Sequence, residues 1–447
     1  MLAAISFKIY ELRKYLLLSL AISMIAIPIG NSLVIQTDRN RNEMYGEAFW
    51  IYGFHVYDMN DQQLAAAMGP LYQDGNHTLP AYLGNITYEY PVFGLIFFAI
   101  ATYLFPGNGS NYQEIWLNFL LVLVFNLNLV LIAILLKDKI YSSRWARMFL
   151  AGYFVYGLML SAGGGKLEPL ADCLLLMALV LHTEGQHNKA MFTLGLSFQT
   201  KIYPLVALPI LFVASPLSIV WFLASLLLSV VPMAAAGLSY GSLFEHFLNS
   251  SSYSSVIVNP LFPGLAWGTP DIAGAAGATY IWPPALVPTF LVGAFFLLTF
   301  RQFLPDKKSF GEASWWGRLE LLVPFYIYCV PCLLFAFRWV MPWYLFWFGA
   351  LIFLFKKDEH AVAYLKLLVV VGLCYAFGVV LNYPYFGARP LPDLLSHFPL
   401  GVLSYAYLAA LIVSSFVAFG IWRWSFNRRE AQQQRYREIE ARGELII

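Results

Sequence analysis

Carboxylates gather in one polar stretch, residues 36–90, of an otherwise apolar chain. This stretch directly follows the first long apolar run, residues 16–35. A carboxylate just past a membrane span lies at the membrane surface, where it could take a proton from an acceptor hydroxyl. Asp38 is our first candidate for such a general base because it stands closest to the run. The acids of the stretch are Asp38, Glu43, Glu47, Asp58, Asp61, Asp74 and Glu89.

A structural interpretation competes with the catalytic one. Asp38 could pair with Arg39 or Arg41 in a solvated cluster at the membrane surface. Glu43 and Glu47 are the alternative bases, and the three remaining mid-loop acids are expected to be surface residues. These are Asp58, Asp61 and Asp74.

A second group of charged residues follows a run of three glycines, residues 163–165. Lys166, Glu168 and Asp172 stand where the chain re-enters an apolar segment. Ionisable residues so close to a bilayer are usually paired and functional. We expect Lys166 to bind phosphate and the two acids to bind substrate, the alternative being an ion pair that closes a helix turn. The spacing is not that of a nucleotide-binding P-loop.

A lysine also interrupts the apolar residues 189–213. Lys201, followed by Tyr203 and Pro204, should cost several kcal/mol in lipid unless it is paired or hydrated. Phosphate is a natural partner for a lysine.

Further along, Arg338 precedes Trp343 and Tyr344. Arginine suits a phosphate and aromatic rings suit a sugar face, although Trp and Tyr also form belts at the membrane interface. Arg389 and His397 are lesser candidates in the last external segment. Glu89 and Tyr90 close the polar stretch and complete the candidate substrate-binding residues.

The composition defines the class of protein. The chain has 447 residues, 60% of them hydrophobic and 12% charged, whereas a soluble domain has about 25% charged residues. It is therefore expected to be an all-α polytopic membrane protein. Cys329 and Cys332 have CxxC spacing but lie among apolar residues, so packing is the expected role. We expect no metal site, no cofactor and no nucleic-acid partner, with a divalent cation left open.

Apolar segments predict about 12 membrane crossings. We divide the chain into an N-terminal module, 1–239, with an external loop at 36–114, a variable C-terminal module, 240–426, and a charged cytoplasmic tail, 427–447. The expected spans are 16–35, 115–136, 146–161, 169–182, 189–200, 202–214, 217–239, 281–300, 319–337, 341–355, 362–381 and 400–424.

Charge placement orients these segments. The basic loop 137–147 should be cytoplasmic, since short cytoplasmic loops are enriched in Lys and Arg. Both termini are then cytoplasmic, residues 92–105 lie at the interface without crossing, and residues 189–213 turn back at Lys201. In the alternative, 92–105 crosses and 189–213 is a single span.

Taken in order, these motifs resemble the GT-C superfamily of polytopic glycosyltransferases. The nearest likeness is to its polyprenyl-phosphate-mannose-dependent branch, which includes the GT87 mannosyltransferases and the GPI mannosyltransferase I family. The family's acid four residues before the position of Tyr45 is Arg41 here, so the base stays among the neighbouring acids. The motifs are Tyr45-Gly46-Glu47-Ala48, Tyr88-Glu89-Tyr90-Pro91, Gly165-Lys166-Leu167-Glu168, Lys201-Ile202-Tyr203-Pro204 and Pro342-Trp343-Tyr344.

The resemblance implies a GT-C-type fold and an inverting transfer of a sugar on the external or luminal face, with mannose as the first candidate for that sugar. The donor would be a polyprenyl-phosphate sugar, the acceptor a lipid or glycan, and the base a first-loop carboxylate. The location would be the cell membrane or the endoplasmic reticulum membrane. Two alternatives stay open: a lipid or solute transporter that uses the same charged residues, and a polymerase or ligase of lipid-linked glycans.

Overall fold

The computed structural model describes residues 2–33, 37–69, 87–88, 90–104, 111–238, 287–336 and 343–381. These residues are almost entirely helical, and their one β-type contact is an isolated bridge between Asn60 and Thr87. Within these described ranges, three helical segments are long and apolar enough to span a membrane: Ile5–Ile29, Ile115–Leu136 and Pro216–Ala235. The expected all-α membrane protein is confirmed.

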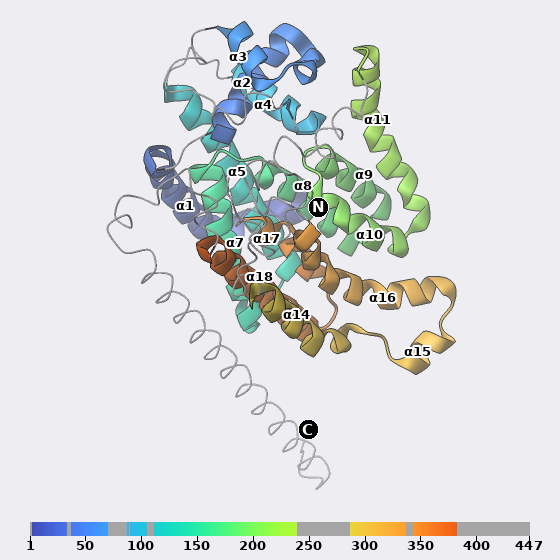
Figure 1. The fold of residues 1–447 in the computed structure, drawn as a ribbon. Helices are drawn as coiled ribbons and strands as arrows, with labels where there is room; N and C mark the ends of the chain where they lie inside the picture. Colours follow the sequence, from blue (N-terminus) through green and yellow to red (C-terminus); the bar gives the residue numbers. More distant parts are fainter. Residues whose placement is uncertain are drawn as a thin grey trace.

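The centre of the fold is a row of helices, each packed on the next (Figure 1). Helix α7 (Arg144–Leu158), which follows α5 (Asn111–Leu136) in the sequence, lies beside the row and packs on α5. Gly157 permits this contact, since a Cβ there would lie 2.1 Å from Phe125 of α5. In order of contact the row consists of α1 (Leu2–Leu33), α5 (Asn111–Leu136), α8 (Glu168–Thr183), α9 (His187–Phe198) and α11 (Ile219–Ala235).

The first polar loop folds into a small helical module at one end of this row (Figure 1). Within it α4 packs on α2 so closely that a Cβ on Gly46 would lie 2.6 Å from the carbonyl oxygen of Phe98. The 13 residues of α4 rise about 20 Å, less than the ~30 Å hydrocarbon core. The module consists of α2 (Thr37–Tyr52), η1 (Gly53–Asp58), α3 (Asp61–Met68) and α4 (Val92–Leu104).

The chain reverses at Lys201, as the sequence predicts. After α9, the helices η5 (Tyr203–Ala207) and α10 (Leu208–Ala214) run back beside it. Ser218, which follows α10, lies next to the start of α9, since its hydroxyl donates to Asn188 Oδ1 at 2.8 Å. The alternative of one continuous helix through residues 189–213 is therefore wrong.

The expected span 400–424 lies outside the described residues. Of the other C-terminal spans, 281–300, 319–337 and 362–381 coincide in position with helices, whereas residues 341–355 differ. This segment forms α17 (Tyr344–Trp347) and η10 (Gly349–Leu354) instead of one helix. Its side chains are buried against the other helices, Phe348 and Leu351 completely, so protein contacts hold the irregular backbone. The neighbouring helices are α14 (Val287–Thr299), η8 (Phe300–Phe303), α15 (Lys307–Glu312), α16 (Trp315–Cys329), η9 (Val330–Ala336) and α18 (Asp358–Leu381).

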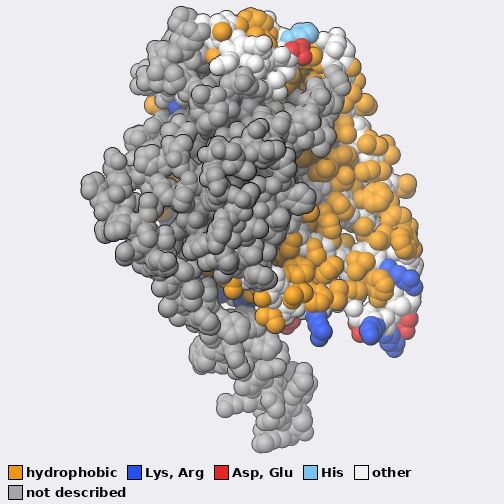
Figure 2. Space-filling model, in the orientation of Figure 1, with side chains coloured by type: hydrophobic (Ala, Val, Ile, Leu, Met, Phe, Trp, Pro, Cys, Tyr) orange, Lys and Arg blue, Asp and Glu red, His pale blue; other side chains and the backbone are white. Residues whose placement is uncertain are grey.

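The surface is apolar over a broad area. In Figure 2, hydrophobic side chains run down the coloured part of the view, at the right, with Lys and Arg mainly at its lower end. Helix α11 contributes several large exposed side chains, as expected of a face turned to lipid. They are Val220, Trp221, Leu223, Leu227, Leu228 and Val231.

Candidate functional site

A buried ion pair joins the N-terminus of α8 to the turn after α9. Lys201 Nζ lies 2.5 Å from Glu168 Oε1, and the Glu168 side chain is only 1% exposed. The two helices are antiparallel neighbours, as the hydrogen bond from Ser197 Oγ to the carbonyl of Ala171 (2.7 Å) shows, so the start of one adjoins the end of the other. A carboxylate is also favoured at a helix N-terminus by the helix dipole.

Aromatic rings lie beside both lysines of the site. Lys201 Nζ lies 5.1 Å from the centre of the Tyr90 ring and 5.3 Å from that of Trp347. Lys166 Nζ lies 4.3 Å from the centre of the Trp343 ring. Such cation–π contacts favour a charged ammonium where water is scarce.

The next turn of α8 carries a second buried acid, Asp172. The hydroxyl of Tyr203 donates to its Oδ1, and that of Tyr153 donates to its Oδ2 at 3.0 Å. Tyr203 in turn stacks on Trp347, with ring centres 4.8 Å apart. Asp172 therefore holds Tyr203 in place and, through it, supports Trp347, which is a structural role within the candidate site.

The glycine run forms a tight turn against the first-loop module. Helix α7 widens into the π-helix η4 (Met159–Gly163), and Lys166 N then donates to the carbonyl of Leu160 at 2.9 Å. Gly165 has φ +56°, and a Cβ there would lie 2.8 Å from Cβ and Cγ of Arg39. The turn thus needs glycine both for its backbone and for the close approach of α2. π-Helical turns are common at functional sites.

Among the first-loop acids whose side chains are described, Asp61 differs from the prediction. Asp61, expected at the surface, is fully buried and accepts from Arg41 Nε at 2.8 Å (Oδ2) and from the Tyr45 hydroxyl at 2.8 Å (Oδ1). The expectation failed because Arg41, 20 positions earlier, is buried as its partner. Arg41 is thus part of a buried pair within the first-loop module.

The three candidate bases all belong to α2. Glu43 is buried, at 1% exposure, one helical turn after Arg39, and Glu47 is partly buried. The side chain of Asp38 lies outside the described residues.

Helix α4 links the first-loop module to the Lys201–Glu168 ion pair. Phe93 N of α4 donates to the carbonyl of Gln199 at 3.0 Å, and Gln199 stands two residues before Lys201.

The structure thus brings together residues from four separate segments that were predicted individually. Trp347 is an additional member that sequence reasoning missed, although its spacing of four from Trp343 indicates a shared helix face. The predicted members that converge are Tyr90, Lys166, Glu168, Asp172, Lys201, Tyr203, Trp343 and Tyr344. Glu89, Arg338, Arg389 and His397 lie outside the described residues, as do the segments 240–280 and 382–447.

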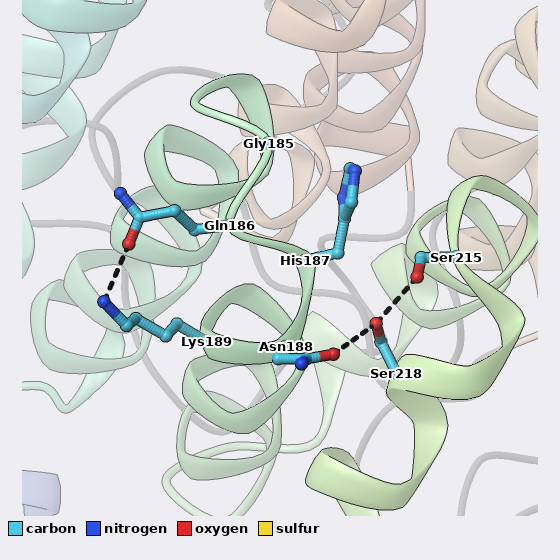
Figure 3. Close-up of a pocket in the computed structure, with 7 residues that line it drawn as sticks. All are labelled: Gly185, Gln186, His187, Asn188, Lys189, Ser215 and Ser218. Atoms are coloured by element: carbon cyan, nitrogen blue, oxygen red, sulfur yellow. Dashed lines mark hydrogen bonds between the residues drawn. The ribbon is translucent and has the colours of Figure 1, made fainter.

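Among the described residues, no group of three or more His, Cys, Asp or Glu is arranged to hold a metal ion. A surface depression lies at the other end of α8 and α9, around His187 (Figure 3). Its polar groups are occupied with one another: Lys189 donates to Gln186 at 3.0 Å and Ser218 donates to Asn188. No set of reactive groups converges there, so the Lys201 region is the candidate site.

Comparison of the chain with protein families, with curated proteins and with solved structures finds no match. The fold and the site together define an all-α membrane protein with a buried Lys–Glu pair walled by aromatic rings.

Proposed function

We propose that this protein is a multi-pass membrane glycosyltransferase. It transfers a sugar, for which mannose is the first candidate, from a polyprenyl-phosphate donor to a lipid or glycan acceptor. The transfer takes place on the external or luminal face, and both termini are cytoplasmic. One observation carries the proposal: Lys166 and Lys201 converge with aromatic side chains at the ends of α8 and α9 that adjoin α2. The region then contains lysines that can bind a phosphate and aromatic rings that can bind a sugar. It adjoins the helix that carries the carboxylates proposed as the base.

The proposed step is a single displacement. The acceptor hydroxyl attacks C1 of the sugar from the face opposite the phosphate, which inverts that carbon. The bond from C1 to the phosphate oxygen breaks, and its electron pair stays on the phosphate. The leaving group is thereby converted from a diester with one negative charge into a monoester with two.

The lysines act on the charge that develops in this step. Lys201 and Lys166 stabilise the departing phosphate, and a preplaced charge of this kind is usually the largest catalytic contribution. Glu168 orients the Lys201 side chain before the donor binds. Arg338 and Arg389 stay as further proposed phosphate ligands.

The proton of the acceptor passes to a carboxylate of α2. Asp38 is the first proposed base, with Glu43 and Glu47 as alternatives. Asp38→Asn, Glu43→Gln and Glu47→Gln, each compared at equal amounts of folded protein, identify the base as the variant that abolishes transfer.

The experiment measures transfer of radiolabelled mannose from polyprenyl-phosphate-mannose to a lipid extract in proteoliposomes. Wild type should give a labelled product, and Lys201→Gln should lower its rate at least about 100-fold. Lys189→Gln is the matched control, because Lys189 is an exposed lysine at the other end of α9. If wild type forms no product from mannose or glucose donors but moves lipid across the bilayer, the protein is a transporter.

A further inference from the structure

Three buried polar atoms of the candidate site have no hydrogen-bond partner. They are Oε2 of Glu168, Nε1 of Trp343 and Nε1 of Trp347. Buried polar groups in native proteins are nearly always paired, so each such atom needs an explanation. A bound ligand or an ordered water molecule would explain these atoms by forming the hydrogen bonds that the protein does not.

The three atoms belong to connected side chains. Trp343 and Trp347 are four residues apart across α17 and therefore lie on one helix face. The Trp343 ring adjoins Lys166, and the Trp347 ring adjoins Lys201, which holds the other oxygen of Glu168. Two donors and one acceptor are thus arranged about the proposed phosphate-binding lysines.

The chemistry of these atoms selects the ligand. A hydroxyl can donate to a carboxylate and accept from an indole N–H, and a sugar ring presents several hydroxyls side by side. A second phosphate would fit poorly, because its oxygens mainly accept and Glu168 would repel them.

We infer that Glu168, Trp343 and Trp347 form the subsite for the sugar ring of the donor, beside its phosphate. Glu168 Oε2 accepts from one hydroxyl, and the two indole N–H groups donate to hydroxyl oxygens. This rests on the proposed function for the identity of the donor. It adds that a neutral polyhydroxyl ring is recognised through these three atoms.

Trp343→Phe and Trp347→Phe test the inference, because phenylalanine keeps an aromatic ring and removes the N–H. Trp145→Phe is the matched control. The indole N–H of Trp145 is also buried without a partner, but this residue lies near the start of α7, where its ring contacts Lys139. A general effect of removing an indole N–H would appear in all three variants.

The measurement is ligand affinity for the full-length protein in detergent, from thermal-shift titrations that also verify folding. The probes are geranyl-phosphate-mannose and geranyl methyl phosphate, two diesters of equal charge that differ in the sugar. Wild type and Trp145→Phe should bind the mannose diester about tenfold more tightly. Trp343→Phe and Trp347→Phe should lose most of this preference and keep their affinity for the methyl diester.

Each remaining outcome is decisive. If both site variants keep the preference of wild type, water satisfies the three atoms and the subsite is overturned. Equal binding of both diesters by wild type also overturns it, while the proposed transfer is judged separately by product formation. A preference for mannose without any transferred product supports the subsite and rejects the transferase.

Discussion

Arg41 and Asp61 form a buried ion pair that closes the first-loop module, with Arg41 Nε 2.8 Å from Asp61 Oδ2. The arginine lies on α2 and the aspartate begins α3. Arg41 Nη2 also donates to the carbonyl of Thr87 at 2.9 Å. One guanidinium therefore ties together both ends of a loop that carries the candidate bases, and this relationship leads to the first prediction.

Asp61→Asn should lower the free energy of unfolding by about 3–5 kcal/mol, because it removes a buried carboxylate that accepts from both Arg41 Nε and the Tyr45 hydroxyl. Thermal unfolding in detergent measures the effect. Asp58→Asn is the control, because the Asp58 side chain is 55% exposed and its ion pair is with His55 on the same surface turn, so its effect should be within about 1 kcal/mol. Equal effects of the two variants would contradict the buried pair.

The second prediction separates structure from chemistry at the Lys201–Glu168 pair. Lys201→Gln alone leaves Glu168 buried without its cation and should destabilise the protein by about 3–5 kcal/mol. Adding Glu168→Gln removes that buried charge and should restore most of the lost stability. Mannose transfer should stay at least about 100-fold below that of wild type in the double variant, because the contribution of the Lys201 charge to the phosphate is still absent. Transfer that recovers together with stability would show that Lys201 serves only the fold.

The third prediction concerns the turn at Gly165. Gly165→Ala should destabilise the protein by more than about 1 kcal/mol, since an alanine there is strained at φ +56° and collides with Arg39. Gly185→Ala is the control: it has a similar φ of +74° but no atom within 4 Å of the added Cβ. The difference between their unfolding midpoints measures the contact with α2. Transfer activity should fall only in Gly165→Ala, and equal losses would remove this turn from the site.

Part of this arrangement could be predicted from the sequence because it depends on local composition. A lysine and a proline inside an apolar run, Lys201 and Pro204, indicate a break, and the chain does reverse there. Lys166 and Glu168 stood out because charged residues are costly next to a bilayer.

Other features depend on partners distant in sequence. Asp61 looks like any loop acid until Arg41 is placed beside it, and residues 341–355 look like a span until their burial is known. The meeting of Trp343 with Lys166, and of Trp347 with Lys201, likewise joins segments more than a hundred residues apart. No periodicity within either segment carries that information.

The last prediction tests the reversal at Lys201 directly. Asn188 and Ser218 touch in the structure, through a hydrogen bond of 2.8 Å, whereas a continuous helix would separate them by about 45 Å. Asn188→Cys combined with Ser218→Cys should therefore react efficiently with a short thiol-specific cross-linker, detected by mass spectrometry of the linked peptides. Asn188→Cys with Ile202→Cys is the control: this pair is closer in sequence but lies about 20 Å apart along α9. Cross-linking of the control pair in preference to the test pair would refute the hairpin, and with it the position of Lys201 beside Glu168.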